Sequence, residues 1–296
     1  QVAEQRGVPF IINIAAAPQI TEQGYKFVFR IFITVPDLLG QALSMMGDLF
    51  RATNVAPRTA VFMHVNDTYG QALAGAVRAF MPRVTNLPFK IVESISYDYN
   101  AKDLTVEISK AKSANPDFLM VATRLNDAIM LRREMVKQRF NTMGLISPGS
   151  RGIYEEQFSK VLGRHANHCV VNVPWFNPKT ELTKMVQGAF AKQYPKDRFV
   201  YYGLNAGYTF EAIMVAADAF RRARSTDPRP LAEAIRQTNI AERIGLGGPI
   251  KFDAKGQIEG SLAACIQIHE GVPRVIFPAE VAEVKPVFPW PEYKRA

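Results

Sequence analysis

The sequence predicts an α/β fold in which parallel sheets carry helices on both faces. Short apolar runs of strand length alternate with amphipathic helical segments along most of the 296 residues. Several of the apolar runs have no polar positions to place on a solvated face, which is typical of strands in parallel sheets. The composition, 48% apolar and 21% charged, is that of an ordinary globular protein without low-complexity tracts or internal repeats.

The first half of the chain provides most of the expected strands. Residues 10–14 form an apolar strand that reads as buried on both faces, and residues 26–34 form a β-rich run. Apolar residues at helical spacing predict a helix over 37–51. Strands are then expected at 59–64, 90–96, 117–122, 144–147 and 168–173, and helices at 69–80, 104–113, 127–139 and 158–162.

Beyond residue 179 the pattern changes to long amphipathic helices, expected at 181–193, 204–224 and 230–238, before strand patterns at 248–253, 263–269 and 272–277. Residues 59–173 contain enough strand–helix units for one complete lobe. The segments on either side offer one fully apolar strand and three helices with too little sheet to cover. Because an unpaired apolar strand exposes an adhesive edge, we expect an N-terminal half-lobe upstream of this segment in the natural protein.

Charge and cysteine content exclude several classes of protein. The formal net charge is +9, from 36 Lys and Arg against 27 acids, but the basic residues are scattered and lack the aromatic interleaving of a nucleic-acid surface. No apolar stretch reaches the ~18 residues of a membrane helix. Residues 1–6 are polar and start at Gln1, so we interpret this end as mature or trimmed. Cys169 and Cys265 lie far apart and are interpreted as buried apolar residues.

The sequence contains no catalytic constellation. Ser150, in PGSRG, lacks the spacing of a nucleophile elbow. His165 and His168 have no carboxylate at ligand spacing, so a solvated loop pair is favoured over a metal site. The glycines of GLGG precede a strand and therefore do not form a phosphate loop. We expect no enzyme activity, no cofactor and no metal.

Small and polar residues instead gather at the carboxyl ends of the predicted strands, where ligands lie in open α/β sheets. Taken singly, each has a structural explanation: Asn66 and Asp67 are good helix caps and Trp175 suits a core. The convergence of five strand ends favours a binding site. The candidates are Asn13, Ala15, Ala16, Asn66, Asp67, Tyr69, Thr123, Arg124, Gly149, Ser150, Trp175 and Phe176.

Four motifs, in order along most of the chain, resemble the type I periplasmic binding proteins. "PFIINIAAAPQITEQGYKFVFR" is similar to that family's strand, small residues, proline and T-x-x-G-Y-x-x-x-x-R. "VNDTYGQALA" is similar to its x-D-x-x-Y-G junction, "ANPDFLMVA" to its P-D-x-x strand, and "GPIKFDAKGQIEG" to its late G-x-x-x-F-D-x-x-G. The nearest branch is the leucine/isoleucine/valine-type receptor of ABC importers.

The resemblance implies two Rossmann-like lobes joined by three crossovers: 1–33 with 174–251, and 34–173 with 252–296. A small carboxylate would bind in the inter-lobe cleft as the lobes close. The family's upstream strand–helix block is missing here, and Gly7 would cap its last helix. The protein would be a periplasmic monomer that serves a membrane permease, without nucleic acid or membrane insertion. The backbone amides of Ala15 and Ala16 would approach the ligand carboxylate.

Departures from the family pattern bear on the ligand. Gly149 or Ser150 stands where amino-acid receptors place the acid that holds the ligand ammonium, and an unpaired ammonium in a closed cleft is costly. Arg124 stands where those receptors often have an aromatic or small polar residue, and Ala16 replaces a usual hydroxyl. With Tyr69, Trp175 and Tyr208 nearby, the site would be cationic and apolar. We therefore expect an aromatic acid such as a benzoate or cinnamate; the alternatives are a receptor for a branched-chain amino acid or amide, and a ligand-sensing regulator of the same fold.

Overall fold

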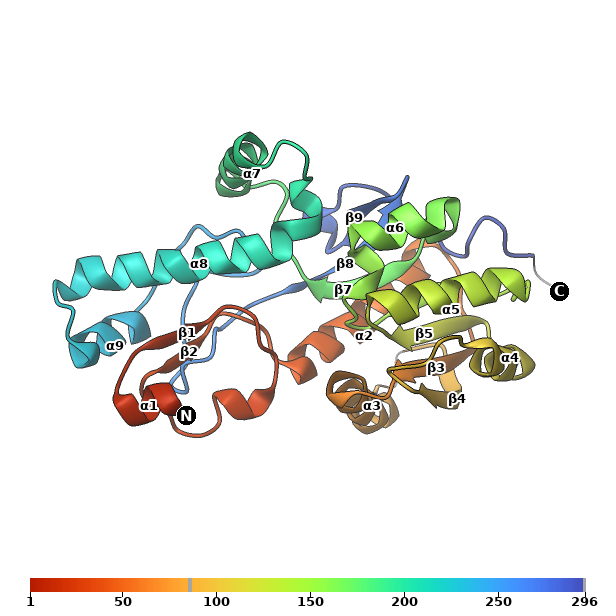
Figure 1. Cartoon of the computed structure of the whole chain (residues 1–296), viewed down its shortest axis with the longest axis horizontal. Helices are drawn as coiled ribbons and strands as arrows, with labels where there is room; N and C mark the ends of the chain where they lie inside the picture. The colour runs from red at the N-terminus through yellow and green to blue at the C-terminus, as the bar shows by residue number, and fades with distance from the viewer. Residues whose placement is uncertain (85–86, 295–296) are drawn as a thin grey trace. The chain divides into compact units, whose positions relative to one another are not determined.

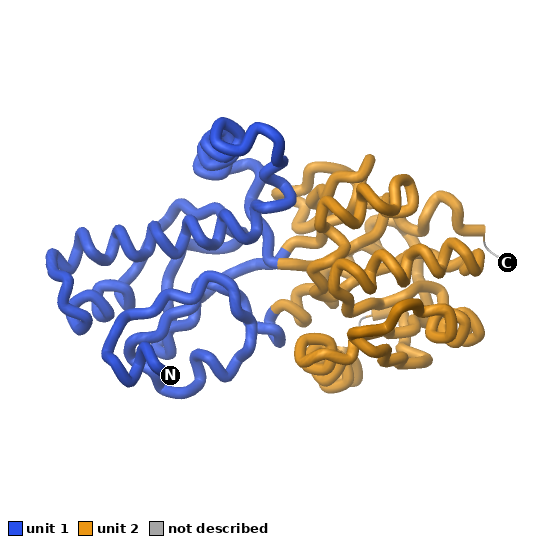
Figure 2. Tube along the Cα trace, in the orientation of Figure 1, with its two compact units in different colours: residues 1–37, 174–263 blue, residues 38–173, 264–296 orange. Residues whose placement is uncertain are grey.

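The chain passes three times between two units, which the computed structural model describes over residues 1–84 and 87–294 (Figure 2). Unit 1 contains residues 1–37 and 174–263, and unit 2 contains residues 38–173 and 264–296. The last crossing lies later in the chain than the expected 251/252. The reason is that the segment after 251 packs on the first segment of unit 1, with the Phe252 ring centroid 5.5 Å from that of Phe29.

A seven-stranded sheet organises unit 2 in the order β4-β3-β5-β6-β7-β8-β9 (Figure 1). The pairs β4–β3, β3–β5, β5–β6 and β6–β7 are parallel, as the sequence predicts, and β8–β9 is an antiparallel hairpin. Since β3 is flanked by β4 and β5, the loops that follow these three strands leave the sheet side by side. The strands are β3 (Thr59–Val65), β4 (Lys90–Tyr97), β5 (Phe118–Ala122), β6 (Leu145–Ser147), β7 (Val170–Pro174), β8 (Ala263–His269) and β9 (Val272–Phe277).

Helices flank this sheet (Figure 1). Their apolar stripes are buried. The stripe predicted within 37–51 is buried: Leu39, Met46 and Leu49 are 0% exposed. Asp67 caps α3, because its Oδ1 accepts a hydrogen bond of 2.6 Å from the Gly70 amide, which confirms the predicted cap. The helices are α2 (Val35–Ala52), α3 (Thr68–Phe80), α4 (Thr105–Ser113), α5 (Leu125–Lys137) and α6 (Glu156–Leu162).

Unit 1 has less sheet than helix. Its parallel pair is β1 (Phe10–Ile12) with β2 (Val28–Arg30), and its helices are α1 (Val2–Arg6), α7 (Glu181–Gln193), α8 (Phe199–Ala223) and α9 (Pro228–Arg236). Gly7 ends α1 at φ 61°, which confirms the predicted cap. β1 is shorter than the predicted strand at 10–14 and is not buried, since Phe10 is 53% exposed beside a single paired neighbour. The strand predicted at 248–253 forms only isolated bridges.

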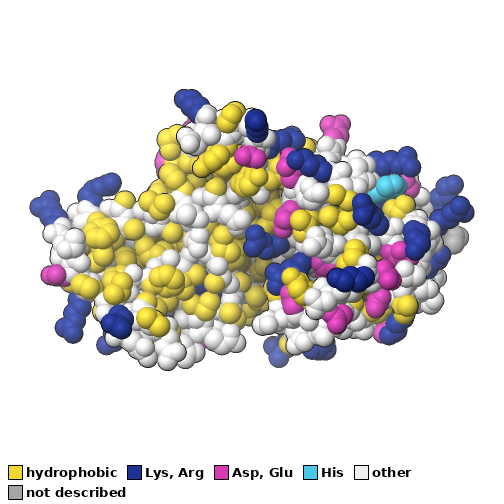
Figure 3. Space-filling view, in the orientation of Figure 1, with side chains coloured by type: hydrophobic (Ala, Val, Ile, Leu, Met, Phe, Trp, Pro, Cys, Tyr) yellow, Lys and Arg dark blue, Asp and Glu magenta, His cyan; other side chains and the backbone are white. Residues whose placement is uncertain are grey.

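Exposed apolar side chains are prominent on unit 1, on the face that Figure 3 shows. In α8, Ile213 is 62% and Phe220 45% exposed, and Val8 is 50% exposed. The expectation of an upstream half-lobe stays a prediction. Cys169 and Cys265, both in unit 2, are free and 0% exposed, in agreement with their interpretation as buried apolar residues.

Candidate functional site

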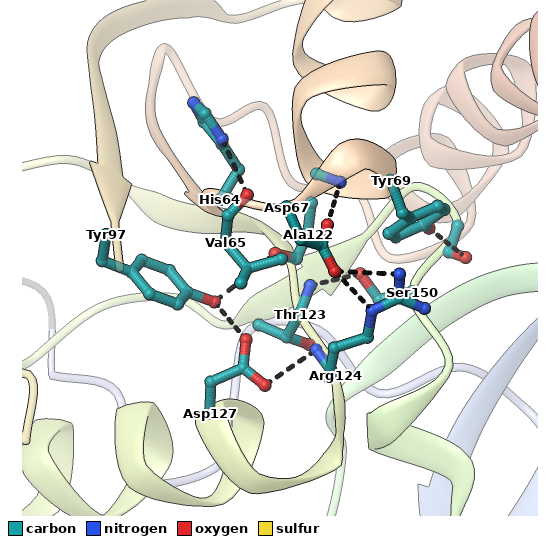
Figure 4. Close-up of polar contacts among 12 residues, drawn as sticks. His64, Val65, Asp67, Tyr69, Tyr97, Ala122, Thr123, Arg124, Asp127 and Ser150 are labelled. Carbon is teal, nitrogen blue, oxygen red and sulfur yellow. Dashed lines mark hydrogen bonds and ion pairs between the residues drawn. The ribbon is translucent and has the colours of Figure 1, made fainter. Parts of the chain in front are cut away.

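Four of the predicted site residues meet in unit 2, at the carboxyl ends of neighbouring strands. Tyr69 follows β3, Arg124 follows β5, and Gly149 and Ser150 follow β6. Figure 4 shows the Arg124 side chain directed to the Asp67 carboxylate and lying beside the Tyr69 ring. The strand order β3-β5-β6 brings these residues together, although up to 80 positions separate them, as in the contact between Tyr69 and Gly149.

An ion pair dominates this cluster. The Nε and Nη2 atoms of Arg124 each lie 2.9 Å from Asp67 Oδ2, and the side chains are 39% and 20% exposed. The Arg124 Cζ atom lies 4.6 Å from the centroid of the Tyr69 ring, in cation–π geometry. The sequence interpretation of a cationic site without an acid was therefore wrong, since Asp67, a candidate whose structural explanation was a helix cap, also neutralises the arginine.

Asp127, the acid nearest to Arg124 in the sequence, has a different role. Its Oδ1 accepts a hydrogen bond of 2.8 Å from the Arg124 backbone amide, and its Oδ2 accepts one of 2.6 Å from the Tyr97 hydroxyl. Burial raises the pKa of this carboxyl, while the bond from Tyr97 opposes the rise. At Gly152 an added Cβ would overlap the Arg124 carbonyl, so only glycine permits this close approach. The backbone of Arg124 is thus held in place by contacts that do not involve its guanidinium.

The side chains of Tyr69 and Ser150 form hydrogen bonds with neighbouring backbone groups. The Tyr69 hydroxyl donates to the Gly149 carbonyl at 2.6 Å, and burial raises the pKa of the phenol, which keeps it a neutral donor. The Ser150 side chain is 0% exposed: its Oγ accepts from the Thr123 amide at 2.7 Å and donates to the Val121 carbonyl at 3.2 Å. Ser150 therefore joins the ends of β5 and β6, whereas the sequence interpretation placed it against ligand.

A cavity of about 750 Å³ opens beside Arg124 in unit 2. The loop after β4 supplies one wall and the start of α5 another. Two of its lining residues are basic, Lys102 and Arg124, and two are acidic, Asp67 and Asp127. Sequence reasoning missed the loop after β4, because its residues carry no motif. The full lining is Asp67, Tyr99, Asn100, Ala101, Lys102, Arg124, Leu125, Asn126, Asp127 and Met130.

In unit 1, Arg30, which is 0% exposed, supports the loop of residues 15–17, here called the alanine loop. Its Nη1 donates to the carbonyls of Ala15 at 3.1 Å and Ala17 at 2.6 Å, while the Ala16 carbonyl accepts from the Val35 amide at 2.9 Å. Three successive carbonyls are thereby satisfied by the protein. Across the described residues, the amides of the half-buried Ala15 and Ala16 donate to no protein acceptor. Burial lowers the pKa of the Arg30 guanidinium.

Of the remaining predicted residues, Asn66 and Thr123 lie in unit 2, whereas Asn13, Trp175, Phe176 and Tyr208 lie in unit 1. Asn13 Nδ2 donates to Thr209 Oγ1 of α8 at 2.8 Å. Tyr208, 1% exposed, packs edge-on against Phe32 with centroids 5.0 Å apart, and burial raises the pKa of its hydroxyl to about 12. Trp175 is 0% exposed and stacks on Phe176 at 5.0 Å. Tyr208 and Trp175 are therefore core residues of this structure, and the structural reading of Trp175 holds.

No group of three or more metal-ligating side chains occurs among residues 1–84 and 87–294. Within the same described ranges, no helix combines the length and the apolar character that a membrane crossing requires.

Comparisons with known proteins agree with this architecture. A family model described as periplasmic binding protein matches residues 1–270. The chain is similar to the leucine-, isoleucine-, valine-, threonine- and alanine-binding protein of Pseudomonas aeruginosa, with 24% identity over 275 residues that cover 92% of this chain and 68% of the relative. The chain thus spans about two thirds of the length of this relative.

Two solved structures share the fold. A leucine-binding protein from Thermotoga maritima is 20% identical with a TM-score of 0.74, over 93% of this chain and 73% of that one. An ABC transporter solute-binding protein from R. palustris, solved in complex with benzoate, is 15% identical with a TM-score of 0.71, over 93% of this chain and 72% of that one.

Proposed function

Because the chain belongs to the periplasmic binding protein family, we propose that it is the solute-binding receptor of an ABC importer and binds a small carboxylate with an apolar, aromatic body. Its partner is the membrane permease, and its compartment is the periplasm. The family consists of binding proteins, which agrees with the lack of a catalytic constellation in the sequence.

The observation that carries the ligand proposal is the stacking of Arg124 on Tyr69, 4.6 Å from Cζ to the ring centroid. A guanidinium recognises a carboxylate through two parallel hydrogen bonds, and a tyrosine ring offers an apolar wall to the body of the ligand. The benzoate complex of the R. palustris protein supports this ligand class. The free amides of Ala15 and Ala16 are proposed as further donors to the carboxylate.

A branched-chain amino acid is the second candidate ligand, and two observations favour it. The names of the Pseudomonas aeruginosa and Thermotoga maritima relatives describe such ligands. Asp67, which lies 2.9 Å from Arg124, provides a negative charge that a ligand ammonium group can use.

Isothermal titration calorimetry of the purified chain with benzoate, cinnamate, leucine and isoleucine tests both proposals. We expect the aromatic acids to bind more tightly than the amino acids. If leucine or isoleucine binds tightly and neither aromatic acid does, the ligand proposal is wrong and the receptor proposal stands. If no small carboxylate binds, the receptor proposal itself fails for this chain.

A further inference from the structure

Asp67 uses its two carboxylate oxygens for different purposes. Oδ1 accepts from the Gly70 amide at 2.6 Å and caps α3, whereas Oδ2 accepts both Nε and Nη2 of Arg124, each at 2.9 Å. The Arg124 side chain remains 39% exposed at the cavity. The cap places the carboxylate, because a helix N-terminus fixes the position of its capping side chain. The acid that contacts the arginine is therefore anchored before any ligand arrives.

A ligand carboxylate that approaches Arg124 meets Asp67 on the same guanidinium. Two carboxylates that share one cation repel each other, while an ammonium group beside the ligand carboxylate is attracted to Asp67. We infer that Asp67 limits the preference of the Arg124 site for simple carboxylates: relative to an uncharged residue at position 67, it weakens the binding of ligands whose only charge is a carboxylate and strengthens the binding of zwitterions. This inference rests on the proposed function, because it takes Arg124 as the anchor of the ligand.

Asp127 provides an internal comparison. It lines the same cavity and is the same residue type, but its carboxyl group accepts from the Tyr97 hydroxyl and the Arg124 backbone amide. Lys102 lines the cavity as well, as a second cation. If selectivity followed only from the total charge of the cavity, Asp67 and Asp127 would be equivalent. If the selectivity follows from contact with the guanidinium, only replacement of Asp67 should change it.

The test compares Asp67→Asn with Asp127→Asn. Asparagine keeps an oxygen that can accept from the Gly70 amide, so the α3 cap survives in Asp67→Asn. The ligands are two matched pairs that differ in the α-ammonium group alone: phenylalanine with 3-phenylpropanoate, and leucine with 4-methylpentanoate. Calorimetry gives the ratio of the two dissociation constants within each pair. This ratio cancels a general loss of folded protein.

We expect Asp67→Asn to shift this ratio about tenfold toward the acid without the ammonium, as the loss of one close charge contact predicts. Asp127→Asn should leave the ratio within about twofold of wild type, since its carboxylate does not contact the guanidinium. An unchanged ratio in Asp67→Asn overturns the inference. An equal shift in both variants overturns it too, because total charge then explains the selectivity.

A measurement without ligand separates this inference from the proposed function. The ¹⁵N NMR signal of the Arg124 Nε–H group in the free chain should move in Asp67→Asn and stay in place in Asp127→Asn. If no ligand of either pair binds wild type while this signal moves as expected, the proposed function fails and the hold of Asp67 on Arg124 is supported. If the signal does not move in Asp67→Asn, the inference is overturned whatever the ligands do.

Discussion

The Arg30 Nε atom donates to Gln257 Oε1 at 2.6 Å, although 227 positions separate the two residues. Arg30 ends the T-x-x-G-Y-x-x-x-x-R motif, and its Nη2 returns to Thr21 Oγ1 at the start of that motif, 3.0 Å away. The Arg30 backbone amide also donates to the Gly256 carbonyl at 2.8 Å. Two motifs from distant parts of the chain thus close on one buried guanidinium, which supports the alanine loop of unit 1.

Replacement of Arg30 by lysine should lower the free energy of unfolding by about 2–4 kcal/mol. Lysine keeps the charge, but its single ammonium group cannot reach Gln257, Thr21 and the alanine carbonyls together, and buried acceptors without donors are costly. Urea unfolding followed by circular dichroism measures the loss. Arg229→Lys, at an exposed position, is the control and should change stability by less than about 0.5 kcal/mol. Equal losses in both variants would contradict the supporting role of Arg30.

Arg124→Ala should weaken ligand binding at least about tenfold, since truncation of a charge-assisted contact costs roughly 2–5 kcal/mol. Arg124→Lys should recover only part of the affinity, because the planar two-point contact is lost. Calorimetry with the ligand that binds wild type most tightly measures both. Lys102→Ala, which removes the other cation of the cavity, is the control. If Arg124→Ala binds the ligand with wild-type affinity, Arg124 does not contact the ligand.

Tyr69→Phe separates the ring of Tyr69 from its hydroxyl. The variant keeps the surface on which Arg124 stacks and loses the bond of 2.6 Å to the Gly149 carbonyl. We expect a loss of about 1 kcal/mol in the free energy of unfolding, and affinity close to wild type. Tyr69→Ala should also weaken ligand binding by about 1–3 kcal/mol, through the lost aromatic surface. Equal affinities of the Phe and Ala variants would show that the ring does not contact ligand.

Acidification should destabilise the chain through His269. Burial, followed by the neighbouring His168 and Arg274, lowers the pKa of His269 below 6.5. The unfolded chain therefore binds this proton more readily than the folded chain, and the free energy of unfolding falls as pH decreases from about 7 to 5. Urea unfolding at both pH values should show a smaller fall in His269→Gln than in wild type. The carboxyl of Asp127, whose pKa is raised, acts in the opposite direction but is present in both proteins. An equal fall in both would contradict the role of His269.

Local patterns were sufficient to predict most elements of this fold. The alternation of buried strands and amphipathic helices predicts the parallel order of β3 to β7, because helical crossovers of that length return the chain in the same direction. Gly7 and Asp67 were predicted as caps, since capping depends on residues within one turn. The ends of β1 and β2 were predicted less well, because their length depends on which neighbours pair with them.

Local sequence patterns therefore suffice to predict which residues reach the carboxyl edge of the sheet, because that follows from strand periodicity and the start of each helix. What those residues contact there depends on how the strands pack. Asp67 and Arg124 are 57 positions apart, and their pairing depends on β3 lying beside β5. Ser150 lies at the predicted edge, but its hydroxyl is hydrogen-bonded to backbone groups at the end of β5. No local sequence pattern links Ser150 to that strand. Side-chain partners across a sheet are set by strand order and register, and these are properties of the whole packed unit.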